Sequence, residues 1–211
     1  MLANGNASVA GSPSVTVPIV ELAASSETGE ILGSGSTDVI EWPELTGSSC
    51  GGEQGFSSFL APQFSCHVAR VRVDPDTGVS RVLEVHAAHD SGTILNPMAA
   101  HGQVEGGILM GVGQAITEGT QYGADGKQRN AALLEYKLQT NADAPKITTQ
   151  FVEIYTENAG PKGAKGLAEA PNVATCGAVN NAIAAATGTR VYQLPMTAER
   201  VWEANHSEVA T

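Results

Sequence analysis

Apolar and charged side chains alternate along residues 67–73 and again along 79–88. This period of two is typical of strands that bury one face. Between the two runs, residues 74–78 read Asp-Pro-Asp-Thr-Gly. Proline presets φ for a turn, and Gly78 tolerates the positive φ that closes it. The pattern therefore predicts a β-hairpin with one buried face.

A longer period follows. From Asn96 to about Glu118, apolar residues recur every four positions, which predicts an amphipathic helix with one buried stripe. Five glycines lie in this segment, and each costs roughly 0.5–1 kcal/mol relative to alanine. The helix backbone is therefore expected to contact a neighbour or a ligand closely. The stripe consists of Val104, Ile108, Val112 and Ile116.

The C-terminal third alternates between strands and helices. Residues 148–154 and 191–194 are predicted as strands, and Thr197 as the N-cap of a last helix that ends near Asn205. Pro171 suits the first turn of another helix, which runs to Gly188. The buried face of that helix is expected to consist of Val173, Cys176, Val179 and Ile183.

Residues 1–66 have a different composition. They are rich in Ser, Gly, Ala and Thr, with short β-prone pieces such as Ser14–Val20, and we expect an extended, loop-rich segment. Residues 1–69 contain seven acids and no Lys or Arg. Such one-sided charge favours an interface segment that packs on another surface, and a partly disordered leader is the alternative. The rest of the chain, residues 67–211, is expected to form the folded domain.

Composition narrows the possible functions. The 211 residues are 42% hydrophobic and carry a formal net charge of −11. This acidity argues against nucleic acid and anionic membranes as partners. No stretch of about 18 apolar residues and no signal peptide is present, so we expect no membrane span and a cytoplasmic location. The three cysteines and five histidines lack the paired spacing of metal ligands, and we predict no metal-ligating residues in this chain.

Residues 160–171 form a glycine-studded loop directly before the helix that starts near Pro171. Its carboxylate, Glu169, is the candidate catalytic base, since a base must stand where a ligand can reach it. Glycines at 160, 163 and 166, with Gly177 further on, let a bulky ligand approach the backbone, and Lys162 and Lys165 add positive charge. The alternative is an exposed turn with a solvated Glu169 and a solvated Lys165.

Four segments, in this order, resemble one family: the molybdopterin-binding subunit of the molybdenum hydroxylases, which include xanthine dehydrogenase and aldehyde oxidoreductase. The resemblance covers residues 67 to about 203, and 195–201 look like the C-terminus of that subunit. It implies an α+β fold, the C-terminal half of the molybdopterin-binding domain, with a mixed sheet and packed helices. The segments are His67–Gly78, Ala88–Gly92 with Asn96-Pro97, Gly102–Gly107 and Gly163–Glu169.

This resemblance implies roles for individual residues. Glu169 matches the active-site base, which takes a proton during hydroxylation of an electron-poor carbon with water as the oxygen source. Gln103 would hydrogen-bond the pterin, and the alternative is a surface amide. Residue 168 is Ala where the family usually has Gly, a departure that reduces backbone freedom beside the base. The other residues expected at the cofactor are Ala99, Gly102, Lys165 and Gly166.

The resemblance also implies partners, because a subunit of this family is several times longer than this chain. We expect one part of a split molybdenum subunit, completed by a second molybdopterin-binding polypeptide. The cofactor would be molybdenum-molybdopterin, in its cytosine dinucleotide form, with iron-sulfur clusters and FAD on an iron-sulfur subunit and a flavin subunit. The substrate would be an aldehyde or an N-heteroaromatic ring. Two alternatives are a non-catalytic structural subunit and an unrelated loop-rich binding module.

Overall fold

A computed structural model describes residues 2–9, 11–33, 63–155 and 161–206. The chain divides into two compact units, Met1–Val39 and Ile40–Thr211. Residues 34–62 of the predicted interface segment, including Cys50, lie outside the described residues, as does Gly160 of the glycine loop. The interface role of residues 1–66 therefore stays a prediction.

The first unit contains a small antiparallel sheet in the order β1 (Leu2–Ala3), β2 (Asn6–Val9) and β3 (Ser12–Pro18). The short helix α1 (Ile19–Ala24) follows. The extended piece predicted over 14–20 therefore ends at Pro18, where the helix begins. Proline lacks the N–H that a strand would need to continue its ladder, and it suits the start of a helix.

In the second unit, the predicted hairpin is confirmed. Strand β4 (Phe64–Val73) pairs antiparallel with β5 (Ser80–Asp90). The N–H of Gly78 donates to the carbonyl of Asp74 over 2.8 Å, and Gly78 has a φ of 72°. A side chain at Gly78 would collide with the backbone of Ala198, so glycine serves both the turn and close packing.

Strand β6 (Lys146–Phe151) lies parallel to β5 and completes a mixed sheet in the order β4-β5-β6. The predicted strand over 148–154 thus begins and ends earlier, because the N–H of Ile154 turns back to the carbonyl of Val152. Helix α2 (Pro97–Ile116) lies between β5 and β6 in the chain, as a parallel connection requires. The α+β class is confirmed.

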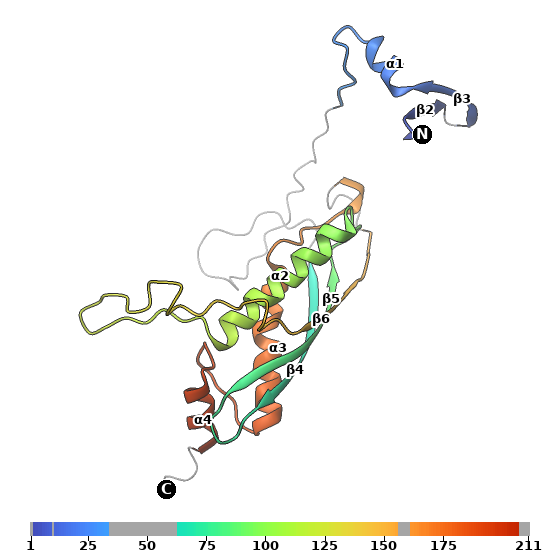
Figure 1. The fold of residues 1–211 in the computed structure, drawn as a ribbon. Coiled ribbons are helices and arrows are strands. Elements are labelled where there is room, and N and C mark those ends of the chain that lie inside the picture. Colours follow the sequence, from blue (N-terminus) through green and yellow to red (C-terminus); the bar gives the residue numbers. More distant parts are fainter. Residues whose placement is uncertain (1, 10, 34–62, 156–160, 207–211) are drawn as a thin grey trace, which may run out of the picture. The chain divides into compact units, whose positions relative to one another are not determined.

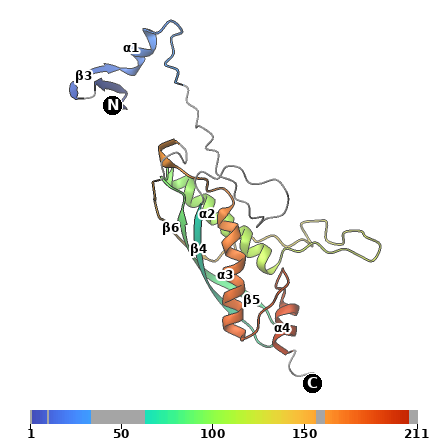
Figure 2. The same ribbon diagram turned by 180° about the vertical axis from the view of Figure 1, so that it is seen from behind.

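Helices α2 and α3 (Ala170–Thr187) pack against each other and cover the same face of the sheet (Figures 1 and 2). Both helices were predicted, α2 with its apolar stripe. The structure adds that Asn96 caps α2, since its Oδ1 accepts from the N–H of Ala99 over 3.1 Å. The predicted buried face of α3 is wrong at Val173, which is 79% exposed. The fully buried core side chains are Val85, Val104, Ile108, Val112, Val179, Ile183, Met196 and Val201.

The error at Val173 has a simple geometric cause. The buried residues Pro171, Thr175, Val179 and Ile183 repeat every four positions along α3. A residue two positions after Pro171 is turned by about 200° and points away from this face. Val173 was predicted to be buried because it is apolar. Its position along the helix relative to Pro171 and Thr175 turns its side chain to the exposed side.

Two glycines of α2 explain its close approach to α3. A Cβ at Gly111 would lie 2.6 Å from the Cβ of Thr175, whereas a Cβ at Gly106 would meet nothing within 4 Å. We expect Gly111→Ala to lower the free energy of unfolding by about 1–3 kcal/mol through overpacking. The control Gly106→Ala should raise it by about 0.5–1 kcal/mol through helix propensity. Urea unfolding followed by circular dichroism measures both, and equal effects would contradict the packing explanation.

The C-terminal helix α4 (Ala198–His206) is confirmed, and the N–H of Arg200 donates to Oγ1 of Thr197, its predicted N-cap, over 3.4 Å. The strand predicted over 191–194 is wrong. The carbonyl of Val191 accepts from the Nδ2 of Asn180, so a side chain takes the bond that a strand would give to a neighbour. Only Val191 is buried there, since Tyr192 is 91% exposed.

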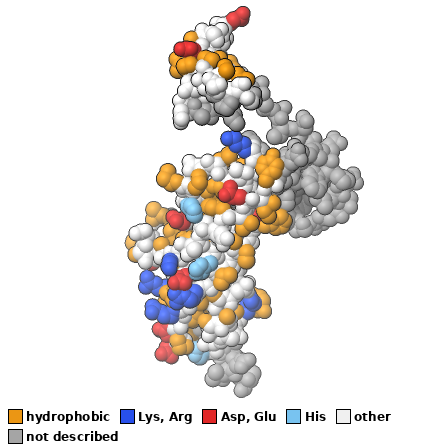
Figure 3. Space-filling model, turned by 90° about the vertical axis from the view of Figure 1, so that its right-hand side faces the viewer, with side chains coloured by type: hydrophobic (Ala, Val, Ile, Leu, Met, Phe, Trp, Pro, Cys, Tyr) orange, Lys and Arg blue, Asp and Glu red, His pale blue; other side chains and the backbone are white. Residues whose placement is uncertain are grey.

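The long connection between α2 and β6 projects away from the helices and the sheet (Figures 1 and 2). Within it, Tyr122 and Gln128 form an isolated antiparallel bridge. Leu133 and Leu134 are 79% and 77% exposed. Figure 3 shows hydrophobic side chains spread widely over one face of the molecule. Exposed leucines at this level are typical of surfaces that receive a partner.

Candidate functional site

The glycine loop is joined to the connection between β5 and α2. It begins with a 3-10 turn, Pro161–Gly163. The N–H of Thr93 donates to the carbonyl of Gly163 over 3.2 Å, and the N–H of Lys165 donates to the carbonyl of Ser91 over 2.9 Å. A side chain at Gly92 would collide with the carbonyl of Gly163, so glycine is required for this approach. The loop is thereby held beside the end of β5.

Lys165 and Asp90 form a buried ion pair. Nζ of Lys165 lies 2.6 Å from Oδ2 of Asp90, and the two side chains are 5% and 8% exposed. Burial alone would raise the pKa of Asp90, but hydrogen bonds from Lys165 and from the N–H of Gly92, with the Lys165 charge, hold that pKa below its ordinary value. Lys165 is therefore not a solvated surface charge. Its charge is directed at Asp90, within the loop that carries Glu169.

Glu169 occupies the N-cap position of α3, and its side chain is exposed. Its carbonyl accepts from the N–H of Asn172 over 2.9 Å, while its carboxylate makes no capping hydrogen bond. Free N–H groups gather at a helix N-terminus and favour a negative charge there. The desolvation expected of a general base would have to come from outside the described residues.

Gln103 connects α2 to the residue before Glu169. Its Nε2 donates to the carbonyl of Ala168 over 2.7 Å. Because a carbonyl can only accept, this contact fixes which way the amide faces and leaves Oε1 pointing elsewhere. Among the described residues, Oε1 has no hydrogen-bond partner. Gln103 therefore lies beside the loop that bears Glu169, and its predicted hydrogen bond to the pterin stays a prediction.

The other predicted cofactor residues of α2 share one exposed face with Gln103. Ala99, Gly102, Gln103 and Gly106 are all exposed, and their spacing of three, four and seven residues places them on one side of the helix. A Cβ at Gly102, Gly106 or Gly166 would meet nothing within 4 Å. The packing of the described residues therefore does not require these glycines, unlike Gly107 and Gly111.

Two histidines form a pair that sequence spacing did not reveal. Nε2 of His67 lies 2.8 Å from Nε2 of His89, and Nδ1 of His67 lies 3.0 Å from Oγ1 of Thr175. The Thr175 hydroxyl donates its proton to the carbonyl of Pro171, so it accepts from His67. The neutral His67 then accepts from the N–H of His89. A chain of donors thus runs from His89 through His67 and Thr175 to Pro171.

Burial keeps this pair neutral. Burial and the neighbouring His89 lower the pKa of His67 to about 4, and burial lowers the pKa of His89. His89 is fully buried, and its Nδ1 has no partner among the described residues. Protonation of either ring would place a charge in the interior and would break the single direction of donation.

The pair predicts sensitivity to acid. Since the folded His67 has a pKa of about 4 and the unfolded residue an ordinary value of 6.5, the unfolded state binds more protons as the pH falls. The contribution of the neutral His67 to the stability of the fold is complete above pH 6.5 and is lost between pH 6.5 and about pH 4. We expect a loss of about 1–2 kcal/mol for this half-buried ring. Urea unfolding from pH 7 to pH 4.5 measures it.

The matched variants are His67→Gln and His101→Asn. His67→Gln removes one of the two titrating rings and should reduce the pH dependence of the unfolding free energy. His101→Asn changes an exposed histidine of α2 that lies outside the pair and should leave the dependence as it is. A dependence that survives His67→Gln at full size would contradict the explanation.

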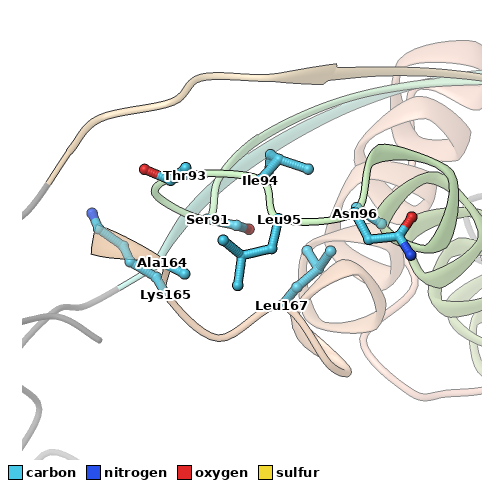
Figure 4. A pocket seen from close by; sticks show the side chains of 9 residues that line it. Ser91, Thr93, Ile94, Leu95, Asn96, Ala164, Lys165 and Leu167 are labelled. Atoms are coloured by element: carbon cyan, nitrogen blue, oxygen red, sulfur yellow. The ribbon is translucent and has the colours of Figure 1, made fainter. Parts of the chain in front are cut away.

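A small pocket lies between the two joined loops. It has a volume of about 150 Å³, and Figure 4 shows its lining from residues 91–96 and 164–167. Leu95, Ile94 and Leu167 make it largely apolar. Pockets that enclose a small ligand usually measure about 300–1,000 Å³. This pocket is therefore too small to enclose a pterin cofactor on its own.

Other site chemistry is limited in the part of the chain that the structure describes. No group of three or more His, Cys, Asp or Glu side chains there could hold a metal ion. Cys66 and Cys176 are free thiols, and burial raises the pKa of Cys176. No described helix is both long and apolar enough to cross a bilayer.

Residues 2–145 match the family described as the molybdopterin cofactor-binding domain. This range is more than half of the chain. The chain belongs to that family. The match includes the hairpin, α2 and the face with Ala99, Gly102 and Gln103. It ends before the glycine loop, so Glu169 lies outside it.

Proteins similar to this member of the family are molybdenum hydroxylases. The xanthine dehydrogenase molybdenum-binding subunit of Escherichia coli is 40% identical over 149 residues, which are 69% of this chain and 19% of that subunit. The aldehyde oxidoreductase structure from Desulfovibrio desulfuricans has a TM-score of 0.65 and 31% identity, covering 72% of this chain and 16% of its own. The quinoline 2-oxidoreductase structure from Pseudomonas putida has a TM-score of 0.63 and 31% identity, covering 66% and 18%.

The family resemblance of the motifs is therefore confirmed. The chain spans about a fifth of the length of these relatives. The family match begins at residue 2, well before the first motif at His67. The family match therefore includes the loop-rich N-terminal segment as well.

Proposed function

We propose that this chain is one part of the molybdenum-cofactor subunit of a molybdenum hydroxylase, with Glu169 as the base. The observation that carries the proposal is the contact between Gln103 and Ala168. It joins the face of α2 that lies inside the family match to the loop that bears Glu169. One surface of the chain thus combines a hydrogen-bonding amide, open glycine backbone and an exposed carboxylate.

The residues present fit a bound pterin. Gly102 and Gly106 leave open space on the α2 face, which a flat ring can occupy at backbone distance. Oε1 of Gln103 is available to accept from an N–H of the ring edge. Ala99 is exposed on the same helix and Gly166 is exposed in the glycine loop, which Lys165 ties to the end of β5 through Asp90. We infer that these residues hold the cofactor, in its cytosine dinucleotide form.

When bound, the molybdenum cofactor supplies the two-electron redox chemistry of the reaction. Glu169 accepts the proton from the oxygen that is transferred to substrate, with water as the source of that oxygen. An exposed carboxylate becomes an effective base once a covering surface excludes water, since desolvation raises its proton affinity. Gln103 holds the backbone next to the base and orients the ring with the same amide.

The substrate and the partners follow from the incomplete wall. We propose an aldehyde or an N-heteroaromatic ring as substrate, the classes named by an aldehyde oxidoreductase and a quinoline oxidoreductase among the relatives. A second molybdopterin-binding polypeptide would close the small pocket and cover Glu169. An iron-sulfur subunit and a flavin subunit would carry the electrons away through their clusters and FAD. The location proposed for this assembly is the cytoplasm.

A test of the cofactor face uses the open glycine. Gly102→Leu should reduce the molybdenum bound per complex at least tenfold, because the leucine fills the space of the ring. The unfolding midpoint of the chain alone should not fall, since a Cβ at Gly102 meets nothing within 4 Å. Elemental analysis of complexes purified through this chain gives the molybdenum content.

Ala186→Leu is the matched control. Ala186 is an exposed residue in the last turn of α3, at the other end of that helix from Glu169. Its complex should keep the molybdenum of the unmodified complex. A purified complex without molybdenum, or one in which Gly102→Leu keeps the full content, would refute the proposed cofactor face.

A further inference from the structure

The last two residues of β5 are each connected to one flank of Glu169. Asp90 holds Lys165 through the buried ion pair at 2.6 Å, and Lys165 lies four residues before Glu169. The backbone of Lys165 is also fixed, because its N–H donates to the carbonyl of Ser91, the residue after Asp90. The loop that leads into Glu169 is therefore attached to the end of β5 by both side chain and backbone.

The second connection reaches the other flank. His89 donates to His67, His67 donates to Thr175, and Thr175 donates to the carbonyl of Pro171, two residues after Glu169. Every link is between 2.8 and 3.0 Å. Since His89 and Thr175 are fully buried, this chain of hydrogen bonds is shielded from competing water.

Between these flanks, Glu169 has little support of its own. Its carboxylate is exposed and makes no capping bond, and its carbonyl bonds only within the first turn of α3. The place of its carboxylate is therefore determined by the backbone on either side. A base must be held within a fraction of an ångström of the atom it deprotonates, because a shift of about 1 Å can cost a hundredfold in rate.

We propose that Asp90, Lys165, His67, His89 and Thr175 are positioning residues that hold Glu169 in place from the end of β5. We call this set the β5 anchor. The inference rests on the proposed function, because it assigns these residues to the base of that reaction. It explains why a charged pair and a polar pair are buried side by side at the end of a strand, where apolar residues would be simpler to accommodate.

The test uses Thr175→Val and Thr175→Ser in the assembled complex. Valine has nearly the shape of threonine but cannot link His67 to Pro171, whereas serine keeps the hydroxyl. We expect Thr175→Val to lower kcat by about tenfold to a hundredfold with KM and molybdenum content unchanged. Thr175→Ser should restore kcat to within about threefold of the unmodified complex.

A second readout is independent of turnover. Hydrogen exchange at the amides of Ala170 and Asn172, which bond to Leu167 and Glu169, reports how firmly this turn is held. Thr175→Val should speed this exchange by about tenfold, the effect of losing one buried hydrogen bond, and Lys165→Met should speed it at least as much. Arg70→Met, which removes an exposed ion pair with Glu84 on the same hairpin, should leave it unchanged.

The outcomes separate the two proposals. Suppose that Glu169→Gln abolishes turnover while Thr175→Val and Lys165→Met retain both the kcat and the slow hydrogen exchange of the unmodified complex. The β5 anchor is then wrong, and Glu169 as the base is still supported. If Thr175→Ser is as impaired as Thr175→Val, or kcat falls only in proportion to lost molybdenum, the residues are merely structural and the anchor is refuted. If Glu169→Gln keeps full turnover, the proposed function itself is refuted.

Discussion

Glu169→Gln should lower the turnover number of the assembled complex by about 10²–10⁴-fold, the usual contribution of a general base. Glutamine keeps the size and hydrogen-bonding shape of the side chain but cannot take up the proton. Because Gln103 and Ala168 hold the neighbouring backbone, the substitution should leave the loop in place. Molybdenum content and substrate KM should therefore remain within about twofold of the unmodified values. Steady-state kinetics with an aldehyde and with a heteroaromatic substrate measure the turnover number and KM. Elemental analysis measures the molybdenum content.

The control for this change is Glu203→Gln, at an exposed residue of α4. It removes the same charge far along the chain from the glycine loop and should leave kcat unaltered. Full turnover in Glu169→Gln would show that the base lies elsewhere, or that the chain is a structural subunit of its complex. Equal losses in both variants would show that net charge, not the base, was being measured.

Lys165→Met should lower the free energy of unfolding of this chain by about 3–5 kcal/mol, because it leaves the buried Asp90 carboxylate without its partner. The Asp90 side chain is 8% exposed, so water cannot replace the ammonium. The pKa of Asp90 is held below its ordinary value in the folded state. The ion pair therefore stabilises the fold at any pH above that ordinary value, and this stabilisation is lost as the pH falls and Asp90 is protonated. Urea unfolding at pH 7 gives the loss directly.

Two further variants serve as controls for the stability loss expected of Lys165→Met. Arg70→Met breaks the exposed ion pair with Glu84, whose N–O distance is 2.8 Å, and should cost less than about 1 kcal/mol. Lys165→Met combined with Asp90→Leu removes both buried charges and should recover much of the lost stability. A single Lys165→Met variant no less stable than Arg70→Met would mean that Asp90 finds other compensation in the fold.

Local patterns carried most of the fold. The turn at 74–78, the four-residue repeat of α2 and the caps at Pro171 and Thr197 each depend on neighbours in sequence, and each was predicted correctly. The errors fell where tertiary contacts decide. Residues 191–194 have strand-forming side chains, yet Asn180 takes the carbonyl of Val191.

Candidate site residues could be singled out from the sequence where a motif marked them, whereas contacts that depend on long-range pairing could not be predicted. Glu169 and Gln103 were both singled out, and the structure joins their neighbourhoods through Ala168. The pairing of Lys165 with Asp90 spans 75 positions, which no local pattern can reveal. His67 and His89 come together only through the register of the hairpin. Counting back from the turn without a bulge would place His67 opposite His86. The bulge between Arg70 and Val71 shifts the register, so that His67 lies opposite Ala87 with His89 next along the same face, and a count along the sequence could not have found the pair.

The projecting connection between α2 and β6 has a consequence for handling the polypeptide. With Leu133 and Leu134 largely uncovered, copies of the chain made on their own should adhere to one another as their concentration rises. The second polypeptide that we propose to complete the subunit would then act as its chaperone, and simultaneous synthesis of the two should decide how much material stays in solution.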